Sequence, residues 1–87
     1  MKLVIAILKD DDTEPVVQAL TTQDFRTTRV ASTGGFFHKG STTLLVGVDD
    51  KQVDAAIEVI KQNTTAAGPG EKRATVFVVP VERFEQL

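Results

Sequence analysis

Blocks of apolar and β-branched residues alternate along the chain with polar segments rich in acids, threonine and glycine. Short blocks of this kind, ended by acids, glycine or proline, are typical of buried strands. Four blocks are predicted to be strands, and they cover residues 2–8, 25–33, 42–48 and 74–80. Two further segments have the apolar spacing or capping signals of a helix, and they cover residues 10–23 and 49–63.

Each predicted helix carries an apolar stripe that should face a core. The stripes consist of Val16, Val17 and Leu20 in the first helix and of Val53, Ala56, Ile57 and Ile60 in the second. An aspartate or threonine is expected to cap the first helix, and Asp49 or Asp50 the second. The acidic run Asp10, Asp11 and Asp12 is expected to cap and solvate a helix start, which is favoured over binding a divalent metal.

The order strand–helix–strand–strand–helix–strand predicts an α+β fold of the ferredoxin-like βαββαβ type. In this fold an antiparallel four-stranded sheet carries both helices on one face. The other face should then alternate with polar residues, yet residues 3–8 and 76–79 are apolar almost throughout. Either short strands are irregular in pattern, or the second face is buried against other subunits. We favour the second explanation, which predicts a homo-oligomer.

Composition narrows the class of protein further. With 87 residues, the chain is expected to form one domain over residues 1–87. The absence of cysteine excludes disulfides and fits a reducing, cytoplasmic location. The apolar stretch at residues 3–8 is too short for a signal peptide, and no segment has the length to span a membrane. A net charge of −2 with mixed signs argues against general nucleic-acid binding.

Catalytic chemistry is not indicated by the residues. The chain has one histidine, His38, and no serine or cysteine set can be assembled around it with any specificity. The segment "GGFFHKG" does not have the spacing of a nucleotide-binding P-loop. We therefore expect a binding or structural protein rather than an enzyme, with no cofactor and no metal.

The hairpin at residues 28–47 carries the richest set of candidate binding groups. Alternate residues of a strand share a face, so Arg26, Thr28 and Ser32 are expected on one face and Arg29 on the other. A guanidinium in line with hydroxyl groups suits the oxygens of a phosphate.

Two glycines and two phenylalanines follow that strand. Gly34 and Gly35 let backbone N–H groups approach a ligand closely. Phe36 and Phe37 either pack on the core or stack on a nucleobase. The spacing of these residues does not decide between a site for a nucleotide or anion and a purely structural hairpin.

The segments "MKLVIAILKDDD", "FRTTRVASTGGFFHKGSTTLLVGVDD" and "ATVFVVPVERFEQL" cover most of the chain. They resemble the PII-like cyclic di-AMP receptors of Gram-positive bacteria, most specifically in F-R-x-T-x-x-x-[ST]-T-G-G-F, G-x-T-T-x-x-x-G-V and A-T-V-F-V-x-P-V. The resemblance implies a PII-like homotrimer of ferredoxin-like subunits. It also implies one cyclic di-AMP at each subunit interface, signalling through a loop rearrangement, and no enzymatic activity.

The resemblance further implies ligand-binding roles for individual residues. Arg26 and Thr28 match polar strand residues that contact the nucleotide, and Gly47 matches a strand glycine near it. Phe77 and Gln86 match residues that are expected to reach the ligand from a neighbouring subunit.

The loop of this hairpin both matches the family and departs from it. Gly35, Phe36 and Phe37 match the segment that holds one adenine. Ser41 stands where the family usually has asparagine, and its single hydroxyl has a shorter reach than an amide. The connection at residues 64–73 is also much shorter than in typical members. In the family, the long form of this connection is associated with signal output.

These observations predict a cytoplasmic signal-transduction protein that binds a nucleotide second messenger, with cyclic di-AMP as the expected ligand, between the subunits of a homotrimer. Its partners would be copies of itself, the cyclic dinucleotide and an unidentified downstream protein, with neither nucleic acid nor membrane involved. The alternatives are a PII-like protein for a different nucleotide or anionic effector, and a structural or interaction trimer without a ligand.

Overall fold

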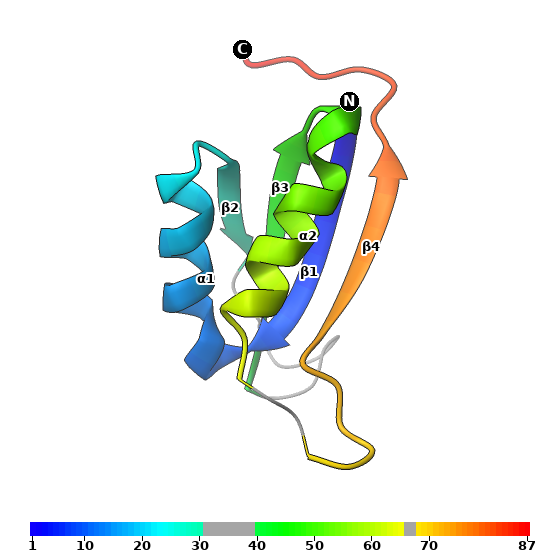
Figure 1. The fold of residues 1–87 in the computed structure, drawn as a ribbon. Helices are drawn as coiled ribbons and strands as arrows, with labels where there is room; N and C mark the ends of the chain where they lie inside the picture. Colours follow the sequence, from blue (N-terminus) through cyan, green and yellow to red (C-terminus); the bar gives the residue numbers. More distant parts are fainter. Residues whose placement is uncertain (31–39, 66–67) are drawn as a thin grey trace.

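The computed structural model describes residues 1–30, 40–65 and 68–87. The strands are β1 (Lys2–Lys9), β2 (Arg26–Val30), β3 (Ser41–Val48) and β4 (Ala74–Pro80). The helices are α1 (Asp10–Thr22), the short 3₁₀ helix η1 (Asp50–Gln52) and α2 (Val53–Gln62). The strands form one antiparallel sheet in the order β2-β3-β1-β4, and both helices cover the same face (Figure 1). The predicted α+β fold, with its βαββαβ order, is confirmed.

The core lies between the sheet and the helices. In the central strand β1, Val4, Ala6 and Leu8 are buried against the helices, while the residues between them face the other side of the sheet. The buried apolar residues are Val4, Ala6, Leu8, Val16, Leu20, Phe25, Leu44, Val46, Val48, Ala56, Val59 and Ile60. Most of the predicted helix stripes is confirmed, with Val17 and Val53 partly buried at the edge of this core. The exception is Ile57 of the second helix, which is not part of this core, whereas Val59 is buried there.

The helix starts differ from the prediction, because no side chain caps them. Lys9 precedes α1 and Gln52 precedes α2, and neither Asp49 nor Asp50 accepts a capping hydrogen bond. Neighbouring segments supply donors for the acids of α1 instead. The carboxylate of Asp10 accepts a hydrogen bond from the hydroxyl of Thr42 on β3.

Asp12 is also not the solvated residue that the acidic run predicted. Its side chain is 3% exposed and accepts hydrogen bonds from the backbone N–H of Thr65 at 3.1 Å and from the Thr65 hydroxyl at 2.5 Å. The first turn of α1 therefore holds the chain segment that follows α2. Within the described residues, no three His, Cys, Asp or Glu side chains come together in a group that could hold a metal ion.

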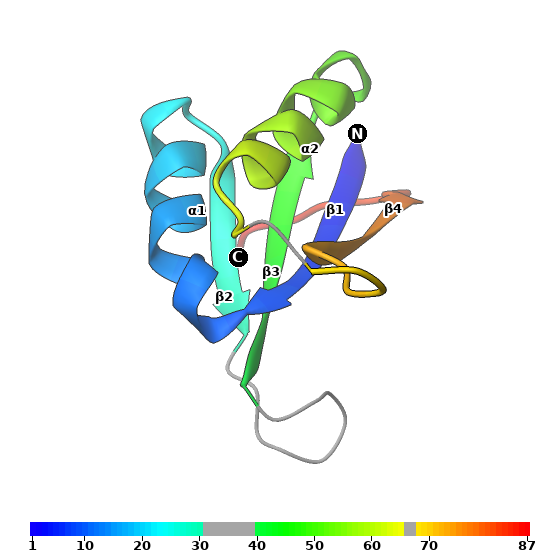
Figure 2. The same ribbon diagram turned by 60° about the horizontal axis from the view of Figure 1, so that its bottom comes forward.

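The face of the sheet opposite the helices, here called the open face, is assembled by the strand register. Its residues are Leu3, Ile5, Ile7, Lys9, Arg26, Thr28, Val30, Ser41, Thr43, Leu45, Gly47, Thr75, Phe77 and Val79. The tail after β4 runs behind β1 and β3 in Figure 2, which places it on this side of the sheet. Among the helices of the described segments, none is both long and apolar enough to cross a membrane.

Replacement of Asp12 by asparagine tests the tie between α1 and Thr65. The Asp12→Asn variant keeps the size of the side chain but replaces one of the two accepting oxygens with an NH₂ group, which then faces a donor of Thr65. We expect the free energy of unfolding to fall by about 1–3 kcal/mol, measured by urea denaturation. Asp11→Asn is the matched control, because Asp11 is exposed, and it should change stability by less than about 0.5 kcal/mol. Equal effects of the two substitutions would contradict this role of Asp12.

Candidate functional site

A cavity of about 240 Å³ lies at one end of the open face. Strand pairing sets Arg26 of β2 opposite Gly47 of β3, and Gly47 in turn lies opposite Leu3 of β1. The tail crosses the sheet here and adds two side chains to the wall. The cavity, here called the Arg26 pocket, is lined by Leu3, Arg26, Thr28, Leu45, Gly47, Phe84 and Gln86.

The lining of the Arg26 pocket combines one cation with hydrogen-bonding and apolar groups. Within the described residues Arg26 has no carboxylate within 4 Å, whereas Arg29, on the other face of β2, is paired with Glu14 of α1. The predicted division of these two arginines between the faces is therefore confirmed. An unpaired guanidinium beside the Thr28 hydroxyl can bind an anion, and the Gln86 amide can both donate and accept hydrogen bonds.

Gly47 lies against the first residue of the chain. A Cβ atom built on Gly47 would lie 3.1 Å from the Cε atom of Met1, so this glycine makes room for the Met1 side chain. The N-terminal ammonium lies 3.0 Å from the Asp50 carboxylate. This hydrogen bond, reinforced by the charge of the ammonium, holds the pKa of the Asp50 carboxyl below its usual value.

The structure brings together four of the residues singled out from the sequence, namely Arg26, Thr28, Gly47 and Gln86. The sequence-based expectation was that Gln86 would reach the site from a neighbouring subunit. In the structure it lines the same pocket as Arg26 of its own chain, because the tail folds back across the open face. The predicted Gly35, Phe36 and Phe37 lie outside the described residues.

Ser41 and Phe77 lie elsewhere on the open face. Ser41 is at the opposite end of β3 from Gly47, and six residues of strand correspond to about 20 Å. Ser41 lines a second cavity of about 200 Å³, here called the Lys72 pocket, with Ile7, Leu8, Lys9, Lys72, Arg73, Ala74 and Thr75. Phe77 pairs with Ile5 on β1, which separates it from Thr28 by three strand spacings, or about 14 Å.

Phe84 is the site residue that sequence reasoning missed. Residues 81–87, after β4, have no helix or strand pattern in the sequence. No periodicity therefore predicts which of their side chains face the sheet. The available signal was the spacing of Phe84 and Gln86, since residues two apart in an extended segment share a side. Phe84 is 56% exposed and lines the Arg26 pocket, where its ring can serve as a wall for a flat ligand.

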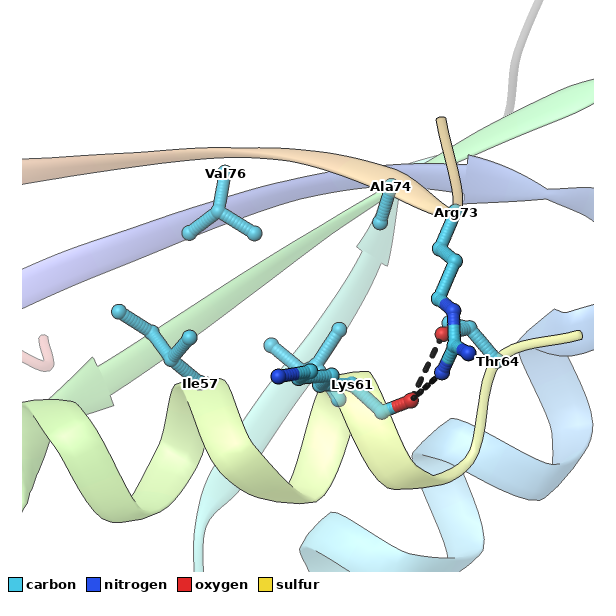
Figure 3. Close-up of a pocket in the computed structure, with 7 residues that line it drawn as sticks. Ile57, Lys61, Thr64, Arg73, Ala74 and Val76 are labelled. Carbon is cyan, nitrogen blue, oxygen red and sulfur yellow. Dashed lines mark hydrogen bonds between the residues drawn. The ribbon is translucent and has the colours of Figure 1, made fainter. Parts of the chain in front are cut away.

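A third cavity, of about 180 Å³, lies between α2 and β4. Ile57, Ala74 and Val76 form its apolar wall in Figure 3. At its end, the Arg73 guanidinium donates to the Lys61 carbonyl at 3.4 Å, and the Thr64 hydroxyl donates to the same oxygen at 3.0 Å. These polar groups close the C-terminal end of α2.

Comparison with known proteins adds two findings. The family model described as "Cyclic-di-AMP receptor" matches residues 1–68, which covers most of the chain up to the segment before β4. A solved structure is also similar, the crystal structure of a functionally unknown protein from Pediococcus pentosaceus ATCC 25745. It shares 34% sequence identity with a TM-score of 0.79, and the match covers 99% of this chain and 96% of that chain. This second likeness extends the match through β4 and the tail. The resemblance seen in the sequence is confirmed, and the chain belongs to the cyclic-di-AMP receptor family.

Proposed function

We propose that this protein is a signalling receptor that binds cyclic di-AMP between the subunits of a homotrimer. Family membership supports the binding of a nucleotide second messenger in general. The Arg26 pocket carries the specific proposal, because an unpaired guanidinium there lies beside hydroxyl, amide, aromatic and apolar groups.

The chemistry of a cyclic dinucleotide fits these groups. Its phosphates are anionic and favour the guanidinium of Arg26 and the hydroxyl of Thr28. Its adenines are flat and carry donors and acceptors at their edges. The ring of Phe84 and the apolar side chain of Leu45 can hold the faces of a base, while the Gln86 amide can pair with its edge.

The separation of the candidate residues supports a site shared by subunits. Ser41 lies about 20 Å along β3 from Gly47, too far for one ligand to contact both in the same chain. In a cyclic assembly with head-to-tail interfaces, one end of each subunit meets the other end of its neighbour. Such an assembly can bring the Arg26 pocket of one copy against the Ser41 end of the next.

The open face also supports an assembly. Its apolar residues Phe77 and Val79, on the outer strand β4, are 53% and 37% exposed. Ile5 and Leu45 lie beside them in the same sheet and are only partly buried. An apolar area of this kind typically marks a surface that another protein covers. We propose that copies of the chain cover it.

Removal of the Arg26 charge tests the ligand assignment. Arg26→Gln should weaken the affinity for cyclic di-AMP at least about tenfold, since a hydrogen bond to a charged group contributes about 1.5–3 kcal/mol. Isothermal titration calorimetry measures this, and light scattering should show an unchanged assembly mass. Arg29→Gln is the matched control, because Arg29 lies on the other face, and its affinity should stay within about twofold of the original. A wild-type protein that gives no heat with cyclic di-AMP would refute the proposal.

The aromatic wall can be tested separately. Phe84→Ala should reduce the affinity for cyclic di-AMP by about 1–3 kcal/mol, because stacking of a base on an aromatic ring contributes this amount. Leu87→Ala is the control in the same tail, since Leu87 does not line the pocket. If the two variants bind equally well in calorimetry, Phe84 is not a wall of the ligand site.

A charge on the β4 side of the open face tests the assembly. Phe77→Glu should shift the protein from trimer to monomer in analytical ultracentrifugation, because a carboxylate buried in an apolar interface is strongly unfavourable. The control Val78→Glu places the same charge on the helix side of the same strand, where Val78 is also exposed. Retention of the trimer by Phe77→Glu, or an equal loss with Val78→Glu, would count against this interface.

A different nucleotide or anionic effector is the alternative ligand, and the serine at position 41 favours it. Calorimetry with cyclic di-GMP, ATP and AMP beside cyclic di-AMP decides between them. We propose a sensing role in the cytoplasm, without catalysis, so incubation with cyclic di-AMP should leave the dinucleotide intact in a chromatographic assay. The downstream protein would recognise a surface that changes on binding.

A further inference from the structure

The Lys72 pocket lies at the end of the open face opposite the Arg26 pocket. Strand pairing places Lys9 of β1 opposite Ser41 of β3, and Ile7 of β1 opposite Thr75 of β4. Lys72 precedes β4 by two residues and completes the lining. Two lysines and two residues with hydroxyl groups therefore line one cavity of about 200 Å³.

The two lysines of this cavity form no ion pair within the described residues. None of the described residues that line it is acidic, and within the described chain neither Lys9 nor Lys72 has a carboxylate within 4 Å. The neighbouring acids have other partners. The Asp10 carboxylate accepts from the Thr42 hydroxyl, and the Glu71 carboxylate accepts from the Gly68 backbone N–H at 3.4 Å.

Arg73 contributes little to the charge of the pocket, although it is part of the lining. Its side chain runs from the start of β4 to the C-terminal end of α2, where the guanidinium donates to the Lys61 carbonyl (Figure 3). The cations available to a ligand are therefore the two lysines. Their ammonium groups are compact point charges with three donors each, which bind phosphate oxygens without a fixed orientation.

We infer that the Lys72 pocket binds a phosphate group, through the ammonium groups of Lys9 and Lys72 and the hydroxyl groups of Ser41 and Thr75. Apolar side chains from Ile7, Leu8 and Ala74 form the rest of the lining, which limits competition from water. The volume corresponds to about six or seven water molecules, so a tetrahedral anion fits with waters to spare.

The inferred role gives Ser41 a use that an asparagine would serve less well. A hydroxyl is a compact donor that can turn toward an anionic oxygen, whereas an amide presents an acceptor beside its donor. Serine at this position is thus suited to a phosphate. The inference shares Ser41 with the proposed function. Its test uses inorganic phosphate, which carries no base, so its failure can be told apart from a failure to bind cyclic di-AMP.

The test uses inorganic phosphate as the probe, on the full chain, at constant ionic strength with chloride as the compensating anion. We expect saturable binding with a dissociation constant of about 1 mM, followed by chemical shifts of backbone amides in nuclear magnetic resonance. The double variant Lys9→Gln/Lys72→Gln should weaken this binding about tenfold or more, because two charge-assisted hydrogen bonds are lost. Ser41→Ala provides a second variant with no change of charge and should weaken binding by a smaller factor.

Two controls separate a site from general attraction by charge. Lys51→Gln removes an exposed lysine that lines neither pocket, and Lys61→Gln removes an exposed lysine of α2 that also lines neither of them. Both should leave phosphate binding within about twofold of the original. Linear, non-saturating shifts in the wild-type protein, or an equal loss in the Lys51 control, would overturn the inference.

The source of the phosphate group is resolved by comparing AMP, adenosine and inorganic phosphate in the same titration. Tighter binding of AMP than of inorganic phosphate, with no shift of the Lys72 pocket by adenosine, identifies a phosphate ester as the ligand. Equal affinity for AMP and inorganic phosphate identifies the free anion. Shifts at the Lys72 pocket with adenosine alone would contradict recognition of a phosphate group.

Discussion

The structure depends on the two-sided pairing of β1, an apolar strand at the inside of the sheet. It forms hydrogen bonds with β3 on one side and β4 on the other, so its register fixes the position of both neighbours. Its even-numbered apolar residues enter the core, and Leu3, Ile5 and Ile7 enter the open face. A shift of one residue would exchange these two sets, which makes the register strongly specified by burial.

The same register arranges the chemistry of the open face. Polar groups lie at its two ends, with Arg26 at one and Lys9 at the other, and apolar side chains lie between them. The segments on either side of β4 add to these pockets. The tail after β4 brings Gln86 to the pocket of Arg26, and the segment before β4 brings Lys72 to the pocket of Ser41. One sheet thus presents two pockets with different linings at opposite ends of the same face.

Local patterns in the sequence predicted the elements and the face of each strand residue, because both depend on short-range periodicity. The opposite placement of Arg26 and Arg29 follows from this period alone. Contacts between distant segments were not predictable in this way. The burial of Asp12 depends on Thr65, which lies 53 residues away, and the position of Gln86 depends on how the tail crosses the sheet. The distance between Ser41 and Gly47 is set by the length of β3 and not by the alternation of residue types.

The exposure of β4 has a further consequence for the single folded subunit. β4 is an outer strand of seven residues, ATVFVVP, with a free backbone edge and with Phe77, Val78 and Val79 exposed. A strand of this composition is a template for edge-to-edge pairing and fibrous aggregation. Pro80 lacks an N–H group and limits such pairing at one end only. A second copy on the open face would shield Phe77 and Val79, whereas Val78, on the helix side of the strand, would stay exposed.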